Sequence, residues 1–533
     1  MLVKTYGSAV HGIEALTVTI EADVSPGLNF HLVGLPDNAV RESQQRISTA
    51  VQSVGMNIPG KRIVINMAPA DLRKEGSAYD LPLALAVLAA SGQINSRFLE
   101  GTLCMGELAL DGTLRPVRGA LSMALHAKKE GFERCVFPLD SAREAAVVEG
   151  IAVYGVTHLA QVLDLVEGYP GLEPLRVDDP ADFPTRPTAD SSTRPTAGFK
   201  LSPTPGSSTA SSAGQAYPDF AQVRGQAQAR RALEVAAAGG HNVLMTGPPG
   251  AGKTFMTKCL PGILPSLTRP EAIETTRIWS VAGLPRKEQG LMRTRPFRAP
   301  HHTASVVSLT GGGAHALPGE ISLAHNGVLY LDELPEFPST ALEVLRQPLE
   351  DGTIRLSRAR YKVDYPARFM LVASMNPCPC GFNGHPSREC VCAEYQIRRY
   401  QNRISGPLRD RMDIHLVVRP VDVEDLIPRE GFVAQAEDSQ AIRARVEQAR
   451  VVQLERFRGL EGVHTNARIP VTLLPRFCPL DVPCRAFLKQ ALERLHLSAR
   501  AHHRILRLAR TIADLDGSAA LQLQHLAEAV QYK

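Results

Sequence analysis

Hydrophobic positions along the first 168 residues switch repeatedly between a two-residue and a helical period. Short apolar runs typical of strands alternate with stretches whose apolar residues recur every three or four positions. The strand-like runs lie at 16–21, 62–66 and 135–138, and the helical stretches at 38–54, 81–91 and 120–130. This alternation predicts an amino-terminal domain of the α/β or α+β class over residues 1–170.

The pattern stops at residues 171–217, where Pro, Ser, Thr and Ala dominate. A short duplication, TRPTAD at 185–190 and TRPTAG at 193–198, lies inside this segment. So few apolar residues cannot bury enough surface to offset the entropy of ordering the chain. We therefore expect a flexible linker and a domain boundary here.

A second α/β unit is expected over residues 218–420. A helical stretch at 223–241 leads into the apolar run NVLMT, a glycine-rich loop and a second helical stretch. From residue 421 to 533 the pattern is mainly helical, and its strongest periodicity lies at 498–516. The whole chain is therefore predicted to be α/β with a carboxy-terminal helical lid.

The segment GPPGAGKT at 247–254 fits the phosphate-binding pattern G-x-x-x-x-G-K-[ST] between a strand and a helix, the context that this motif requires. Its glycines let backbone N–H groups turn toward phosphates, Lys253 can reach the terminal phosphates, and Thr254 offers a hydroxyl to Mg²⁺. The predicted nucleotide-binding residues are Gly247, Pro248, Pro249, Gly250, Ala251, Gly252, Lys253 and Thr254.

Two further apolar runs end in polar residues that suit ATP hydrolysis. GVLYLDEL at 327–334 ends in Asp332, which can hold Mg²⁺ together with Thr254, and Glu333, which can polarise the attacking water. RFMLVASMN at 368–376 ends in Asn376, which could orient that water. The motifs together predict an ATPase that uses ATP and Mg²⁺.

These motifs resemble those of the AAA+ ATPases, and more closely those of the magnesium-chelatase-like bacterial proteins of the ComM/YifB type. The resemblance covers nearly the whole chain apart from the linker. It is carried by FHLVGLPDNAVRES (30–43), INMAPADLRKEGSAYDLPLAL (65–85), AAAGGHNVLMTGPPGAGKT (236–254), FRAPHHTAS (297–305), PGEISLAHNGVLYLDELPEF (318–337), SMNPCPCG (374–381) and ISGPLRDRMDI (404–414).

The resemblance implies a homo-hexameric ring with ATP bound between subunits. Asn376 matches the first sensor, Arg411 the arginine finger that completes a neighbour's site, and Arg500 the second sensor, a role for which Arg504 and Arg507 compete. The alternative for Arg411 is a surface ion pair. The implied activity is that of a DNA helicase: ATP-driven branch migration during homologous recombination of incoming DNA in natural transformation. The implied partners are single-stranded, double-stranded or branched DNA and a recombinase or other recombination proteins.

Two rival functions follow from the same resemblance. One is a chelatase-type motor that remodels a partner to insert Mg²⁺ into a porphyrin, although no porphyrin site is recognisable. The other is an ATP-dependent protease, because the amino-terminal domain resembles the Lon-protease fold. Matching its pattern puts Ala78 where the serine would stand and Leu121 where the lysine would stand. Ser77 and Lys74 lie nearby, but a serine without a positioned base is a poor nucleophile, so we expect a non-proteolytic domain.

Four cysteines, Cys378, Cys380, Cys390 and Cys392, form C-x-C-x₉-C-x-C directly after Asn376. Two close pairs of thiolates suit tetrahedral Zn²⁺, which would close a loop too rich in Gly and Pro to fold alone. The spacing is tighter than the usual C-x₂₋₄-C, so free thiols or a labile disulfide remain alternatives, and His385 could replace one ligand. We predict a structural zinc knuckle over 378–392.

Two basic segments are candidates for DNA binding without sequence preference. Residues 350–369 read as a hairpin that Arg355, Arg358, Arg360 and Lys362 load with charge. Arg398 and Arg399 follow the cysteines, with tyrosines interleaved. The alternatives are an ordinary charged edge hairpin and a solvated helix face.

Bulk composition adds only weak limits. The net charge of +5 permits a polyanionic partner without requiring one. Nine cysteines, five of them scattered singly, fit a reducing compartment. No apolar run is long enough for a membrane span, and the first residues lack the pattern of a secretory signal. These features predict a cytoplasmic protein without a membrane partner.

Overall fold

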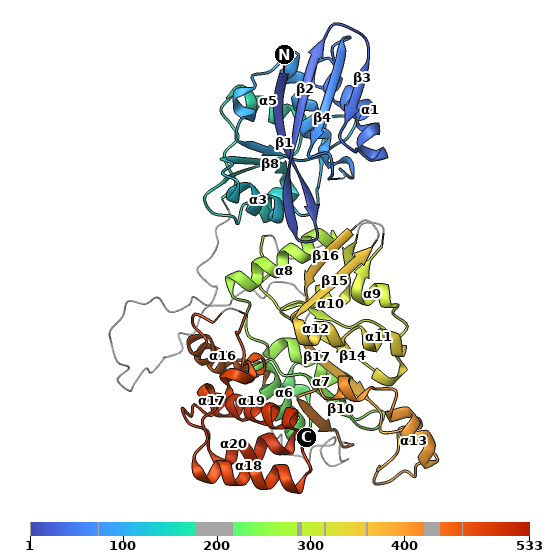
Figure 1. Cartoon of the computed structure of the whole chain (residues 1–533), viewed down its shortest axis with the longest axis vertical. Coiled ribbons are helices and arrows are strands. Elements are labelled where there is room, and N and C mark those ends of the chain that lie inside the picture. Colours follow the sequence, from blue (N-terminus) through green and yellow to red (C-terminus); the bar gives the residue numbers. More distant parts are fainter. Residues whose placement is uncertain are drawn as a thin grey trace, which may run out of the picture.

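The computed structural model describes residues 2–72, 74–176, 217–284, 290–313, 316–358, 361–420, 437–460 and 462–533 (Figure 1). Most of the predicted linker, residues 177–216, lies outside these ranges, as does Arg360 of the predicted basic hairpin. The side chain of Arg358 is also not described.

The amino-terminal part is built on a mixed seven-stranded sheet of order β3-β4-β2-β1-β5-β8-β9. Its strands are β1 Leu2–His11, β2 Glu14–Ser25, β3 Phe30–Val33, β4 Arg62–Ala68, β5 Thr102–Cys104, β8 Arg134–Pro138 and β9 Ala152–Val156. A small ribbon pairs β6 Glu107–Leu108 with β7 Leu114–Arg115. The helices are α1 Asn38–Ser53, α2 Asp80–Ala90, α3 Ala120–Lys129, α4 Leu139–Ala145 and α5 Leu159–Glu167. All three predicted strands and all three predicted helices of this part are confirmed.

The second part contains a five-stranded sheet of order β11-β14-β17-β10-β18, in which every pairing is parallel. The strands are β10 Val243–Thr246, β11 Phe297–Arg298, β14 Val328–Leu331, β17 Met370–Met375 and β18 Ile414–Val417. Every residue of β14 and β17 is buried, as expected for parallel strands covered on both faces. Because the strands are parallel, their carboxyl ends meet at one edge and bring together the polar residues that follow them.

Short helices and ribbons surround this sheet. The helices are α6 Ala227–Gly239, α7 Lys253–Cys259, α8 Arg269–Ala282, α9 Val306–Thr310, α10 Glu320–Leu323, α11 Ser339–Glu343, α12 Arg346–Asp351, α13 Glu394–Gln401 and α14 Gly406–Arg409. One ribbon pairs β12 Gly311–Gly312 with β13 Leu317–Pro318, and another pairs β15 Thr353–Arg358 with β16 Tyr361–Pro366. The second ribbon confirms the hairpin predicted over 350–369.

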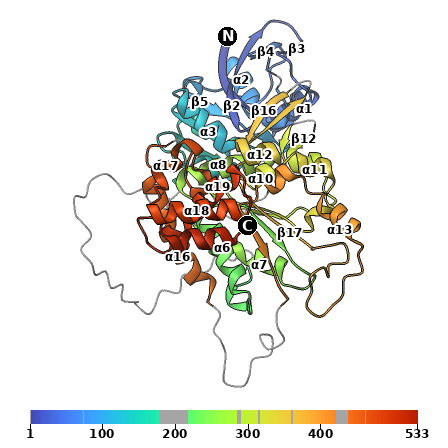
Figure 2. The same cartoon turned by 60° about the horizontal axis from the view of Figure 1, so that its bottom comes forward.

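The carboxy-terminal part consists of helices joined by loops, with no strand among the residues that the structure describes. Its helices are α16 Ser439–Arg456, α17 Leu474–Phe477, α18 Val482–Arg494, α19 Ala499–Leu515 and α20 Leu523–Gln531. These helices lie beside α6, on the other side of the core from α13 (Figure 2). The periodic stretch predicted at 498–516 is α19, whose buried face packs on α6, α16 and α20.

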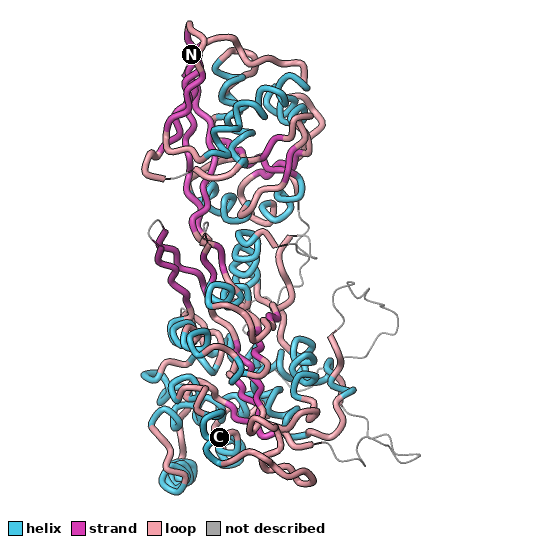
Figure 3. The backbone as a smooth tube through the Cα atoms, turned by 90° about the vertical axis from the view of Figure 1, so that its right-hand side faces the viewer, coloured by secondary structure: helices cyan, strands magenta, loops and turns pink. Residues whose placement is uncertain are grey.

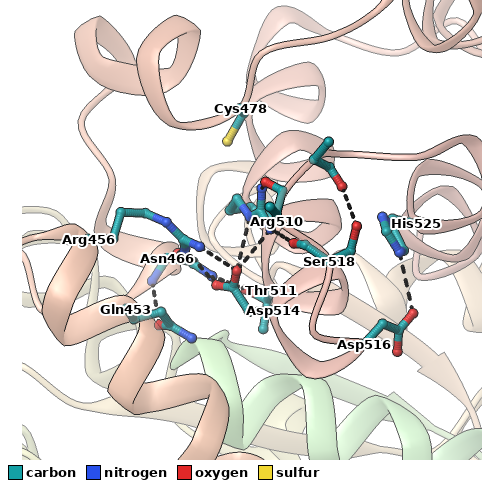
Figure 4. Close-up of polar contacts among 12 residues, drawn as sticks. Gln453, Arg456, Asn466, Cys478, Arg510, Thr511, Asp514, Asp516, Ser518 and His525 are labelled. Atoms are coloured by element: carbon teal, nitrogen blue, oxygen red, sulfur yellow. Dashed lines mark hydrogen bonds and ion pairs between the residues drawn. The ribbon is translucent and has the colours of Figure 1, made fainter. Parts of the chain in front are cut away.

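A buried charged network holds these helices together (Figure 4). The carboxylate of Asp514 in α19 accepts hydrogen bonds from Arg456 at 2.6 and 2.5 Å, from Arg510 at 3.1 Å and from Asn466 at 2.7 Å. The side chain of Asp514 is fully buried, and that of Arg510 is 2% exposed. One buried carboxylate therefore forms ion pairs with two guanidinium groups, one from α16 and one from α19.

Among the described residues, the amino-terminal part contacts α8 and the hairpin of β15 and β16. Arg277 of α8 donates to the carboxylate of Glu14 at 2.9 Å and to the carbonyl oxygen of Ile13 at 2.7 Å. The strands β1 and β2 extend toward the core (Figures 1 and 3), and the ring of His11 at their turn lies 3.0 Å from the carbonyl oxygen of Lys362 in β16. A Cβ on the neighbouring Gly12 would lie 2.4 Å from Val363, so this close contact requires glycine. The amino-terminal sheet is thus in direct contact with the basic hairpin.

Candidate ATP-binding site

The phosphate-binding loop follows β10 and leads into α7, as predicted. Gly250 and Gly252 have positive φ angles of 78° and 85°, which L-residues with a side chain rarely adopt. The loop borders a cavity of about 380 Å³ whose lining includes the loop, Asp332, Glu333, Ser374 and Asn376. The structure therefore brings the predicted ATP residues of three separate motifs to one place.

Lys253 points into the turn of this loop. Its ammonium group donates to the carbonyl oxygens of Gly247 at 2.5 Å and Pro248 at 2.8 Å, and to Oδ1 of Asn376 at 3.2 Å. Burial lowers the pKa of Lys253, whereas the carboxylates of Asp332 and Glu333 act in the opposite direction. The lysine therefore lies where the terminal phosphates of a bound nucleotide would supply counter-charge.

The side chains of Asp332 and Thr254 are in direct contact at the edge of the cavity. The hydroxyl of Thr254 donates to Oδ2 of Asp332 at 2.9 Å, and Ser374 donates to the other carboxylate oxygen. Burial opposes ionisation of Asp332, but the hydrogen bonds from Ser374, Thr254 and Tyr330 outweigh it and lower the pKa. An ionised carboxylate beside a hydroxyl is a donor set that fits Mg²⁺.

Glu333 lies at the exposed side of the same edge. Its backbone adopts the left-handed conformation, with φ of 52°, and its N–H donates to Oδ1 of Asp332 at 3.0 Å. Its carboxylate is 55% exposed and lies 3.5 Å from Nδ1 of His302. Solvent therefore reaches the carboxylate, as it must if this group is to polarise an attacking water.

Neither the predicted arginine finger, Arg411, nor the predicted second sensor, Arg500, is among the residues that line this cavity. Arg411 forms an ion pair with Glu350 of α12 and donates to the carbonyl oxygen of Pro407 at 2.8 Å. Arg500 pairs with Asp410 at 3.3 Å and is half-exposed. Burial, and then repulsion by Arg500 and Arg346, lowers the pKa of Arg411. The two arginines are therefore close to one another and separate from their own chain's phosphate-binding loop.

Arg504 and Arg507, which compete with Arg500 as the second sensor, are buried in structural contacts. Arg504 donates to the backbone carbonyl oxygens of Asp410, at 3.3 Å, and of Met412. Arg507 donates to the carbonyl oxygen of Ile469 at 2.7 Å. Arg504 is buried and Arg507 is partly buried, whereas the side chain of Arg500 is half-exposed, so Arg500 is the most accessible of the three.

Sequence reasoning missed the residues that hold Asp332 in place. The hydroxyl of Tyr330 donates to Ser374 at 3.2 Å, and Ser374 in turn donates to Asp332. Each lies two positions before a predicted strand-end residue, Tyr330 before Asp332 and Ser374 before Asn376. Because alternate residues of a strand share one face, this spacing was the signal that could have found them.

The four cysteines form one compact cluster in which all four sulfur atoms lie within 4.8 Å of one another. Sγ of Cys378 lies 3.4 Å from that of Cys380 and 3.6 Å from that of Cys390. A tetrahedral Zn²⁺ with Zn–S bonds of about 2.3 Å needs sulfur atoms about 3.8 Å apart, so the donor set fits this metal. The ring of His385 instead accepts a hydrogen bond from the N–H of Ser387 at 3.2 Å, outside the cluster.

The cysteine loop packs directly against the phosphate-binding loop. A Cβ on Gly381, whose φ is 86°, would lie 2.6 Å from the ring of Pro249. The side chain of Gln401 in α13 also donates to the carbonyl oxygen of Pro377 at 3.1 Å. A metal bound by the cysteines would therefore stiffen a wall of the nucleotide site.

We expect the purified protein to contain about one zinc per chain, because four thiolates are already gathered for it. Cys390→Ala should lower the zinc content by at least about tenfold and slow ATP hydrolysis through the contact at Pro249. Metal analysis by mass spectrometry, with Cys135→Ala in the amino-terminal core as the matched control, measures this. Metal-free protein with four reactive thiols would contradict it.

Of the predicted DNA-binding residues, those that the structure describes lie at the surface. Arg355 and Lys362 are exposed on β15 and β16, and Arg355 lies 3.7 Å from the carboxylate of Asp364. Arg398 and Arg399 are exposed on α13, and Arg398 forms an ion pair with Glu394. The apolar face of the hairpin, which includes Ile354 and Val363, packs into the core, so the charged face is left to solvent.

The positions expected for a Ser–Lys protease dyad hold no such pair. Leu121 is fully buried in the amino-terminal core. The hydroxyl of Ser77 donates to Glu107, and the ammonium group of Lys74 donates to the carbonyl oxygen of Pro69. Each candidate group is therefore engaged with a different partner.

Comparison with known proteins agrees with this site. The model of the family "Magnesium chelatase, subunit ChlI" matches residues 219–426, and related models for subunit ChlI and for its carboxy-terminal part match residues 20–141 and 436–533. The chain is 41% identical to the competence protein ComM of Haemophilus influenzae over 100% of this chain and 97% of ComM. It is a magnesium-chelatase-like AAA+ protein of the ComM/YifB type.

Two further proteins are similar in sequence to this ComM/YifB-type protein. It is 42% identical to the uncharacterised protein YifB of Escherichia coli, over 98% of this chain and 96% of YifB. It is also 33% identical to the DNA repair protein RadA of Pseudomonas aeruginosa, over 24% of this chain and 25% of RadA. Membership of an AAA+ family indicates ATPase activity with ATP and Mg²⁺. Among the helices that the structure describes, none combines the length and apolar composition of a membrane span.

Proposed function

We propose that this protein is a DNA-stimulated ATPase that assembles into a hexameric ring and drives branch migration of recombining DNA in natural transformation. One observation supports an ATP site that is shared between neighbouring subunits. Among the described residues that line the phosphate cavity, Lys253 is the one basic side chain, whereas Arg411 lies elsewhere, beside Glu350. Besides Mg²⁺ and the loop lysine, phosphoryl transfer uses an arginine that stabilises charge at the γ-phosphate, and a neighbouring subunit's Arg411 would supply it.

The residues of the site divide the chemistry among themselves. Backbone N–H groups of residues 247–252 and the ammonium group of Lys253 would hold the phosphates, while Thr254 and Asp332 would hold Mg²⁺. Glu333 would accept the proton of the attacking water, and Asn376 would orient that water.

Three observations favour DNA as the partner. ComM is named for competence and RadA for DNA repair. Arg355 and Lys362 are exposed on one hairpin, where they could follow a phosphate backbone without reading sequence. The hairpin also follows the helix that contains Glu350, and Glu350 forms an ion pair with Arg411. DNA bound by the hairpin could therefore change the position of Arg411.

The test is ATP hydrolysis without DNA and with single-stranded, duplex and four-way-junction DNA. We expect stimulation that is strongest on the junction and that falls steeply with salt, because phosphate contacts release counterions. Arg355→Ala combined with Lys362→Ala should lower the stimulation by about tenfold and leave the DNA-free rate unchanged. Lys489→Ala, which removes an exposed lysine of α18, is the matched control. A rate that is indifferent to every DNA would contradict the proposal.

A further inference from the structure

A cavity of about 70 Å³ lies at the edge of the core sheet opposite the phosphate-binding loop. Gly327 and Met370, at the starts of β14 and β17, form one wall, and residues 462–468 of the carboxy-terminal part form another. The polar residues of the ATP site follow the other ends of the same strands. The cavity is therefore separate from the ATP site, although two strands connect them.

Four arginines line this cavity: Arg295, Arg368, Arg450 and Arg468. Arg295 is paired with Glu271, since two guanidinium nitrogens lie 3.1 and 2.9 Å from its carboxylate oxygens. The other three form no direct ion pair with a carboxylate among the residues that the structure describes, although Glu271 attracts Arg450 and Asp413 attracts Arg468 at longer range. Among the same residues, Arg450 donates to the carbonyl oxygen of Ala237 at 3.3 Å, and its Nε is buried without a partner.

Unpaired guanidinium groups in one small space are unfavourable. Burial and then repulsion by Arg295 lower the pKa of Arg450 to about 9, and burial and then repulsion by Arg368 lower that of Arg468 to about 10. Buried charges are normally paired, and a buried donor without an acceptor costs free energy. A ligand that supplies negative charge and several acceptors would remove both costs.

We propose that this cavity binds a phosphoryl oxyanion, held by Arg368, Arg450 and Arg468. Planar guanidinium groups match the oxygens of a phosphate through paired hydrogen bonds. The small cavity suits one tetrahedral oxyanion. The group could be inorganic phosphate or one phosphodiester of a nucleic-acid backbone, since both present the same oxygens.

The position of the site gives the ligand a structural consequence. Arg450 belongs to α16 and Arg468 is the last residue of η6 (Asn466–Arg468) in the carboxy-terminal part, whereas Arg368 lies in the core, two residues before β17. An oxyanion between them would join the carboxy-terminal helices to the core by charge-assisted hydrogen bonds. It would therefore raise the resistance of the protein to unfolding, whatever the protein does with DNA.

The experiment titrates inorganic phosphate into full-length protein carrying Lys253→Ala, which weakens phosphate binding at the ATP site. Calorimetry against sodium chloride of equal ionic strength should show one phosphate per chain. Arg468→Gln in the same background should weaken that binding by at least about tenfold, and Arg494→Gln, at an exposed position of α18, should leave it unchanged. Phosphate binding that is equal in the Arg468→Gln protein, or absent beyond the chloride control, would overturn the proposal.

The thermal unfolding temperature is a second measurement, and it shows whether the Arg468→Gln protein fails to bind phosphate or fails to fold. In chloride alone, Arg468→Gln should unfold at the same or a higher temperature, because it removes a repelling charge. Phosphate should then raise the unfolding temperature of the parent protein only. An Arg368→Gln protein should behave in the same way. Equal stabilisation of all three proteins by phosphate would count against the site.

Competition identifies the source of the oxyanion. A short oligothymidylate that displaces phosphate and loses affinity on Arg468→Gln would assign the site to a nucleic-acid backbone. Phosphate binding that the oligonucleotide leaves unchanged would assign it to the free ion. Either result supports an oxyanion site, and neither depends on stimulation of ATP hydrolysis by DNA.

Discussion

Arg411→Ala should lower ATP turnover by about 10³-fold, because an arginine finger contributes about 10³–10⁵ in rate to phosphoryl transfer. ATP binding should be nearly unchanged, since Arg411 lies outside the cavity that its own chain offers to the nucleotide. Steady-state hydrolysis together with equilibrium binding of a fluorescent ATP analogue measures the two effects separately. Arg494→Ala, at an exposed position of α18, is the control and should change neither.

Mixing two inactive variants shows whether the finger acts between subunits. Lys253→Ala removes the phosphate contact but keeps Arg411, and Arg411→Ala does the reverse. In a ring with random assembly at equal amounts, about a quarter of the interfaces would combine an intact loop with an intact finger. Activity should therefore return toward that fraction of the wild-type rate. A mixture as inactive as its components would show that the two groups do not act across an interface.

Asp514→Ala should destabilise the carboxy-terminal helices by about 3–5 kcal/mol, the cost of removing one partner from a buried ion pair. The reason is that Arg456 and Arg510 would keep their charges in the core without the carboxylate that neutralises them (Figure 4). Denaturant unfolding followed by circular dichroism measures the change. Asn466 would also lose its partner at 2.7 Å, which adds to the effect.

A matched control separates charge from packing. Glu447→Ala removes the carboxylate of an ion pair with Arg443. The side chains of Arg443 and Glu447 are 41% and 44% exposed. Exposed pairs contribute about 0–1 kcal/mol, so this variant should unfold almost as the wild type does. If Asp514→Ala and Glu447→Ala had equal effects, burial of the network would not be what makes it stabilising.

Local patterns in the sequence were sufficient for the secondary structure near the ATP site. The helix predicted at 38–54 is α1, and the apolar runs that end before Asp332 and Asn376 are β14 and β17. These predictions succeed because a buried strand and a phosphate-binding loop are each determined by residues that are adjacent in the sequence. The residues that follow these strands then lie close together, because the carboxyl ends of parallel strands meet at one edge of the sheet.

Contacts between distant segments could not be predicted in this way. Glu350 pairs with Arg411, yet no local period in the sequence links these two residues. The four arginines of the second cavity come from segments between residues 295 and 468, and each one alone reads as an ordinary surface residue. Only the packing of the carboxy-terminal helices on the core brings them together.

Branch migration of a synthetic four-way junction tests the central claim most directly. The arms carry a fluorophore and a quencher, and heterology at the centre blocks spontaneous movement. With ATP and Mg²⁺ the wild-type protein should separate the labelled strands, whereas the Lys253→Ala protein should leave the junction intact. Hydrolysis of ATP by the wild type without any movement of the junction, at low salt and with DNA bound, would contradict the account.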